Sequence, residues 1–145
     1  MEYQRFDETF LLRLDRGEEI IDCLRRFAQA EDVTLAHVSA LGAADAFTVG
    51  VYDVAAQKYH SFSFEGPYEI TSLTGTINTM DGEFYTHLHM TAATMGGQTV
   101  GGHLNRARIS ATCEMVITRI PGRVDRSRDE NVGLNLFRFE NGKTL

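Results

Sequence analysis

A single stretch of this 145-residue sequence has the periodicity of an amphipathic helix, and it lies near the N-terminus. From about Glu18 to Ala30, apolar residues recur at helical spacing, which places them on one stripe of a helix. The stripe consists of Ile20, Ile21, Leu24, Phe27 and Ala28. The preceding Asp15-Arg16-Gly17-Glu18 resembles a capping box, with an acidic N-cap and Glu18 at N3. We therefore predict one helix over about residues 18–30.

Elsewhere the apolar residues alternate or form short runs, which is the pattern of seven or eight β-strands. Gly66-Pro67 and Met80-Asp81-Gly82 have the composition of turns. The predicted strands are Tyr3–Leu14, Val33–Leu41, Phe47–Tyr52, Tyr59–Phe64, Tyr68–Asn78, Glu83–Ala93, Ala107–Ile120 and Leu134–Phe139. We expect one domain over residues 1–145, of the α/β class (α+β type), with a strongly twisted, mostly antiparallel sheet covered by the helix. The edges of such a sheet need cover, which self-association provides.

Charge and hydropathy narrow the classes of partner. The net charge is −6 and the pI is about 5.3, whereas a domain that binds duplex DNA normally carries a basic patch. The densest basic stretch, Arg123–Glu130, has three arginines and three acidic residues, so we predict a solvated loop there. The N-terminus lacks the apolar region of a signal peptide, and no apolar run is long enough to span a membrane. We expect a cytoplasmic protein with no membrane partner.

The strand Glu83–Ala93 carries two histidines on one face, because side chains at i and i+2 of a strand point the same way. His87 and His89 share the polar face with Glu83, while the other face is apolar and should pack on the core. A third histidine, His103, follows four closely spaced glycines, which allow a compact turn or a close approach of backbones. We therefore predict that His103 returns to the strand that carries His87 and His89.

Three converging imidazoles predict a metal site with an open coordination position. Imidazole ligands favour zinc first, then iron, nickel or copper, and such a centre acidifies a bound water. Glu83 and Glu114 are the candidate carboxylates to support the ligands or to act as a general base. Arg106 and Arg108 follow the glycine turn and are further candidates to bind an anion near the metal, although arginines at such positions are more often ordinary strand-edge residues.

A set of motifs spread over about residues 8–120 resembles the plant- and prokaryote-conserved (PPC) domain family. The motifs are Arg13-Leu14-x-x-Gly17-Glu18, Val38-Ser39-Ala40-Leu41-Gly42-Ala43, Gly82-x-Phe84-x-x-His87-x-His89, Gly101-Gly102-His103-Leu104 and Thr112-x-Glu114. The resemblance implies a twisted antiparallel sheet, a homotrimer, and a divalent metal at His87, His89 and His103. In plant members the domain accompanies AT-hooks that hold DNA; this chain contains no Arg-Gly-Arg-Pro hook.

These observations predict a small cytosolic homotrimer that binds a divalent metal, with zinc preferred. Its role has two alternatives. The first is a DNA-binding or regulatory protein, as the family name implies. The second is a metal-dependent lyase or hydrolase that acts on a small anionic substrate.

Overall fold

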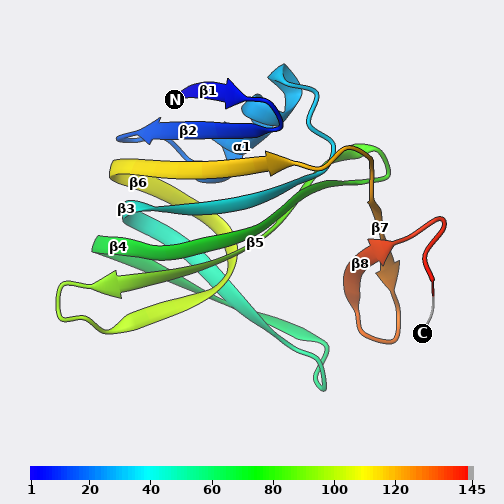
Figure 1. Cartoon of the computed structure of the whole chain (residues 1–145). Helices are drawn as coiled ribbons and strands as arrows, with labels where there is room; N and C mark the ends of the chain where they lie inside the picture. The colour runs from blue at the N-terminus through cyan, green and yellow to red at the C-terminus, as the bar shows by residue number, and fades with distance from the viewer. Residues whose placement is uncertain (144–145) are drawn as a thin grey trace.

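The computed structural model describes residues 1–143. Figure 1 shows a strongly bent sheet with a helix beside it, and a separate strand pair near the C-terminus. The predicted class is confirmed: the sheet is antiparallel, and the described residues contain one helix. That part of the chain has no helix with the length and hydropathy of a membrane span. The elements are β1 (Glu2–Phe6), β2 (Thr9–Asp15), α1 (Ile20–Ala30), β3 (Ala36–Asp53), β4 (Lys58–Met80), β5 (Glu83–Thr94), β6 (Thr99–Arg119), β7 (Asp125–Asp129) and β8 (Leu134–Arg138).

The central strands are longer than predicted, because two expected breaks do not interrupt pairing. The expected strands Val33–Leu41 and Phe47–Tyr52 are parts of the single strand β3, which starts at Ala36. The expected turn at Gly66-Pro67 is wrong: β4 continues through it. Ala44 pairs with Tyr68 and Ala46 with Glu65, so two residues of β4 oppose one of β3 in a β-bulge. A glycine and a proline are tolerated within a strand at such a bulge.

The opposite error occurs at the N-terminus, where the expected strand Tyr3–Leu14 is a hairpin. β1 and β2 pair antiparallel, with Phe6 opposite Thr9. Asp7 has φ 53° in the connecting turn, a conformation that aspartate adopts more readily than most residues. The alternation of apolar residues continues across the turn in sequence, and so it conceals the break.

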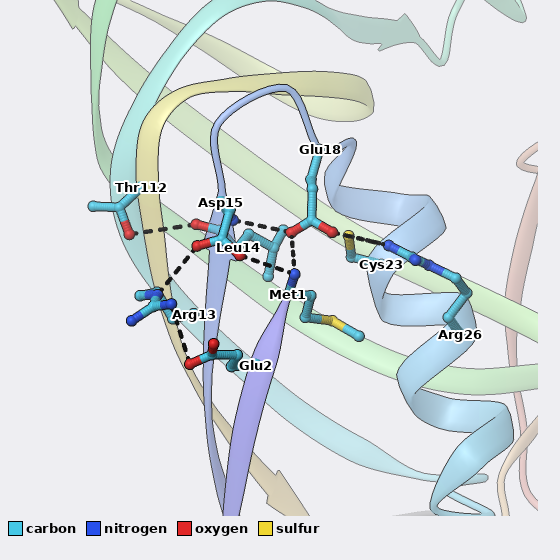
Figure 2. Close-up of polar contacts among 9 residues, drawn as sticks. All are labelled: Met1, Glu2, Arg13, Leu14, Asp15, Glu18, Cys23, Arg26 and Thr112. Carbon is cyan, nitrogen blue, oxygen red and sulfur yellow. Dashed lines mark hydrogen bonds and ion pairs between the residues drawn. The ribbon is translucent and has the colours of Figure 1, made fainter.

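The helix begins later than predicted, at Ile20, and its N-cap is Glu19, whose carboxylate accepts a hydrogen bond from the Asp22 amide at 2.8 Å. Glu18 closes the preceding turn instead. Its carboxylate accepts from the Asp15 amide at 2.9 Å and lies 2.7 Å from the Met1 ammonium nitrogen (Figure 2). The capping box predicted at Asp15 is therefore wrong in place, although its Glu18-to-backbone contact exists. This cluster ties the start of β1 to the β2–α1 turn.

The sheet closes on itself through β6. The order of strands is β1-β2-β6-β3-β4-β5, and β6 also pairs with β5. One side of β6 pairs with β3, and the other side pairs first with β5 and then with β2. The four long strands thus form a closed ring of pairings, visible in Figure 1 where β5 and the start of β6 lie side by side. The buried core includes Phe10, Leu24, Phe27, Phe47, Leu73, Leu88, Ile109 and Met115.

Candidate metal centre

Strand alternation sets the orientation of the first two histidines. Leu88 and Met90 on β5 are 1% and 2% exposed, so that face of the strand packs in the core. His87 and His89 therefore project from the opposite face, as predicted, and both are exposed. In register, His87 lies opposite Thr76 of β4.

His103 joins them at the point where the ring of strands closes. It lies on β6, opposite His89 on one side and opposite Gly50 of β3 on the other. The preceding Gly102 allows this, because a Cβ there would lie 2.5 Å from the Gly50 carbonyl oxygen. Gly97, with φ 80°, forms the turn between β5 and β6. The predicted return of His103 to the histidine strand is confirmed, although His103 belongs to the strand rather than to the turn.

The three imidazoles are close enough to share one ion. Each offers a ring nitrogen, and these nitrogens lie within 4.8 Å of one another. The ring centroids are 5.2 Å apart for His87 and His89, 5.2 Å for His87 and His103, and 5.6 Å for His89 and His103. Among residues 1–143 this is the one group of three or more histidine, cysteine or acidic side chains with such spacing.

The surroundings of His87 and His103 favour the neutral form of the imidazole, which is the form that binds metal. Although the His87 side chain is exposed by surface area, the protein atoms around its ring partly desolvate it; this desolvation, followed by the charges of Arg126 and His89, lowers the pKa of His87. Burial and the neighbouring histidines lower the pKa of His103 to about 4. His103 is therefore uncharged at neutral pH, and the lowered pKa of His87 favours its uncharged form as well, so each of these rings keeps one nitrogen lone pair.

Arg126 is the residue of this site that the sequence analysis missed. The stretch Arg123–Glu130 was predicted to be a solvated loop, but it contains strand β7, and Arg126 is only 4% exposed. Its Nη1 donates to the Asn135 carbonyl oxygen at 2.7 Å, and its Nε donates to Asn78 Oδ1 at 3.1 Å. Its Nη2 lies 3.4 Å from His87 Nδ1. Charge alternation along β7 gave no sign of this burial, because only pairing with β8 and packing on β4 create it.

The histidines face a cavity of about 870 Å³ between the sheet and the β7–β8 hairpin. This volume is in the range of small-molecule sites. Its lining combines aromatic and aliphatic side chains with a few polar groups, and no aspartate or glutamate of residues 1–143 lines it. The lining includes Tyr52, Tyr59, Tyr85, His87, His89, His103, Asn105, Arg126, Arg128, Leu134, Asn135 and Leu136.

The other predicted polar residues lie elsewhere. Glu83 is exposed at the start of β5, and Glu114 is exposed on β6, opposite Leu41 and eleven positions after His103. Neither carboxylate lines the cavity. Arg108 is paired with Asp45 at 2.7 Å outside it. The structure therefore brings none of these three residues to the cavity wall. Position on a strand does not report where that strand bends away from the histidines.

Comparison with known proteins gives a family match over most of the chain. Residues 1–121 match the family described as the Plants and Prokaryotes Conserved (PCC) domain. All three histidines fall within this range, whereas Arg126 lies beyond it. A search of curated proteins gives no match.

Solved structures of the same fold cover almost the whole chain. A metal-containing protein from Archaeoglobus fulgidus is 31% identical, with a TM-score of 0.86, and the match covers 95% of this chain and 97% of that one. A candidate DNA-binding protein from Bacteroides thetaiotaomicron is 25% identical, with a TM-score of 0.92 and coverage of 97% and 98%. A plant- and prokaryote-conserved protein from Pyrococcus horikoshii, 24% identical, has a TM-score of 0.83 over 95% and 94% of the chains and supports the fold alone.

Proposed function

Because the chain belongs to the Plants and Prokaryotes Conserved domain family, we propose that it is a metal-binding protein that holds a divalent ion, preferably zinc, at His87, His89 and His103. The observation that carries this proposal is the convergence of three ring nitrogens within 4.8 Å. The similarity to a metal-containing protein of Archaeoglobus fulgidus supports it.

The donor set fits zinc. Tetrahedral zinc with bonds of about 2.0–2.1 Å holds its nitrogen ligands about 3.3 Å apart. The three ring nitrogens, within 4.8 Å of one another, would draw together to that spacing by rotation of the exposed His87 and His89 side chains toward the half-buried His103. Three neutral imidazoles leave one coordination position open, as in catalytic rather than structural zinc sites. A zinc ion held in this way supplies Lewis-acid chemistry at that position.

Metal analysis of the purified protein tests the site. We expect about one zinc per chain in the wild type and less than a tenth of that in a His87→Ala, His89→Ala, His103→Ala triple variant, because each imidazole supplies a ligand. His60→Ala, which removes an exposed histidine outside the cavity, serves as the matched control and should retain full metal. Stoichiometric metal in the triple variant, or a metal-free wild type after growth with added zinc, contradicts the assignment.

We further propose that the protein is a cytoplasmic homotrimer. Large apolar side chains are exposed on neighbouring strands of the sheet: Leu11 of β2 is 48% exposed, Leu41 of β3 58%, and Val116 of β6 44%. Leu11 and Val116 are paired in register, so they form part of one apolar surface that a partner would cover. Light scattering should give three times the chain mass of 16.2 kDa. A mass of one chain contradicts the trimer.

DNA binding is the alternative function. The structural neighbours from Bacteroides thetaiotaomicron and Ralstonia eutropha are described as candidate DNA-binding proteins, which favours it. The net charge of −6 opposes it. Binding through phosphate contacts weakens steeply with salt. Titration of a fluorescent DNA duplex with the protein at low and high salt therefore tests whether the protein binds DNA. Salt-sensitive binding would support the DNA role, and no binding at low salt would eliminate it.

A further inference from the structure

Arg126 is a buried cation with no acidic partner among residues 1–143. The other buried polar side chains near it are neutral, and no ion pair within that range involves it. Burial lowers the pKa of Arg126, which expresses the cost of keeping a charge away from water. Removing a guanidinium from water without a counter-charge is unfavourable, so an anion at this position would stabilise the protein.

The guanidinium is held rigidly at the wall of the cavity. Its central carbon lies 4.2 Å from the centroid of Phe137 and 5.1 Å from that of Tyr85, so aromatic rings flank it. Neutral oxygens of Asn78 and Asn135 accept from Nε and Nη1. Of the five N–H groups of an arginine, these bonds use two, and a third reaches only the Nδ1 atom of His87 at 3.4 Å. Donors on Nη1 and Nη2 therefore remain for a ligand.

The charge around the cavity is positive, although the protein as a whole is acidic. A divalent ion on three neutral imidazoles would add two positive charges beside Arg126, and no carboxylate of the described residues lines the space. Arg128 also lines it, but its Nε lies 3.4 Å from Glu130 Oε1, which offsets its charge. The uncompensated charge is thus concentrated between Arg126 and the histidines.

The remaining lining indicates an organic ligand rather than a bare inorganic anion. Val51, Leu134 and Leu136 supply apolar surface, and Tyr59 and Tyr85 supply aromatic rings with hydroxyl groups. We propose that this cavity binds a small organic carboxylate, whose carboxylate pairs with Arg126 while its opposite end faces the three histidines. The planar fork of arginine matches a carboxylate through paired hydrogen bonds. This proposal rests on the metal site proposed above for its full affinity, but the pairing with Arg126 does not require the metal.

Calorimetry with lactate as the probe tests the proposal, with lactamide as its uncharged analogue and inorganic phosphate as a second anion. We expect zinc-loaded wild type to bind lactate, and to bind lactamide and phosphate at least about tenfold more weakly, because a charged hydrogen-bonded pair and an apolar contact are both needed. Arg126→Gln should lower the affinity for lactate at least about tenfold. The matched control Arg108→Gln removes one positive charge outside the cavity and should bind like the wild type.

Two measurements keep the test decisive. If Arg126→Gln does not fold, an NMR titration of the wild type takes the place of that variant. The Arg126 Nε–H resonance should then shift on addition of lactate and not on addition of lactamide. Metal content, measured on the same samples, separates the two proposals: a metal-free wild type in which lactate still shifts Arg126 refutes the metal site alone. Metal-loaded protein that binds no lactate at about 10 mM, or binds phosphate as tightly, overturns the carboxylate proposal.

Discussion

At the scale of single residues, the candidate metal centre depends on how closely backbones approach one another. Gly102 is the clearest case, since it brings β6 against the Gly50 carbonyl oxygen immediately before His103. Gly75 has the same role beneath His87: its φ is 155°, and a Cβ there would collide with the His87 carbonyl oxygen. Small residues beside the histidines are therefore part of the site, although they cannot bind the metal themselves.

We expect Gly102→Ala to destabilise the protein by about 1–3 kcal/mol, because the added methyl group overpacks a backbone contact that cannot yield without moving a strand. The displaced strand should also hold His103 away from His89 and reduce the zinc content. Urea unfolding and metal analysis measure both effects. Gly96→Ala is the control, since its Cβ would meet only side-chain atoms at 3.7 Å or more. Equal stability and zinc content in the two variants would contradict this role of Gly102.

The histidines illustrate what sequence reasoning can reach. Strand alternation predicted the shared face of His87 and His89 from local information, and the glycines predicted the return of His103. Arg126 could not be found in this way. Its neighbours along the chain are charged and polar, as in a solvated loop, and its burial comes from contacts with residues far away in sequence, such as Asn78.

At the scale of elements, the start of α1 is joined to the sheet by one carboxylate. Glu19 caps the helix through the Asp22 amide, and its other carboxylate oxygen accepts from the Ala107 amide of β6 at 2.9 Å. The helix is thereby fixed in position against the strand that carries His103. The sequence predicted the helix itself well, because its apolar stripe is local, but it placed the cap too early, since several acidic residues compete for that role.

Glu19→Ala should lower the free energy of unfolding by about 2 kcal/mol, because it removes an N-cap and leaves the amide of the buried Ala107 without its acceptor. Chemical denaturation monitored by circular dichroism measures the change. Glu69→Ala removes an exposed glutamate of β4 and should change stability by less than about 0.5 kcal/mol. A loss of stability no larger in Glu19→Ala than in Glu69→Ala would refute the capping role.

At the scale of the whole molecule, the Met1 ammonium and Glu18 bind the beginning of the chain to the turn before the helix (Figure 2). Burial alone would raise the pKa of Glu18, but hydrogen bonds from Met1, the Asp15 amide and Arg26 lower it from 4.5 to about 2. The hydrogen bond to Glu18 raises the pKa of the Met1 ammonium above 8.0. The pair therefore contributes its full stability only at pH values between the ordinary pKa of Glu18, 4.5, and that of the Met1 ammonium, 8.0.

The difference in melting temperature between wild type and Glu18→Gln should be largest between about pH 5 and pH 8. It should shrink as the pH falls from 4.5 toward 2, where Glu18 takes up its proton, and again as the pH rises through the raised pKa of Met1. Calorimetric scans across this range measure it. A difference that stays constant from pH 3 to pH 7 would show that the Glu18 charge does not contribute.

Because the sheet closes through β6 beside the histidines, metal binding would also affect how β5 and β6 align during folding. Sliding β6 by one residue along β5 would bring Gly102 or Leu104 opposite His89 and turn every side chain of that segment to the other face. A bound ion would thus stabilise only the register in which the three imidazoles converge, and it would give no stability to a register shifted by one residue. Cobalt bound in place of zinc would absorb visible light only when the three imidazoles converge. The time at which this absorption appears during refolding would therefore report when β6 pairs with β5 and the ring of strands closes.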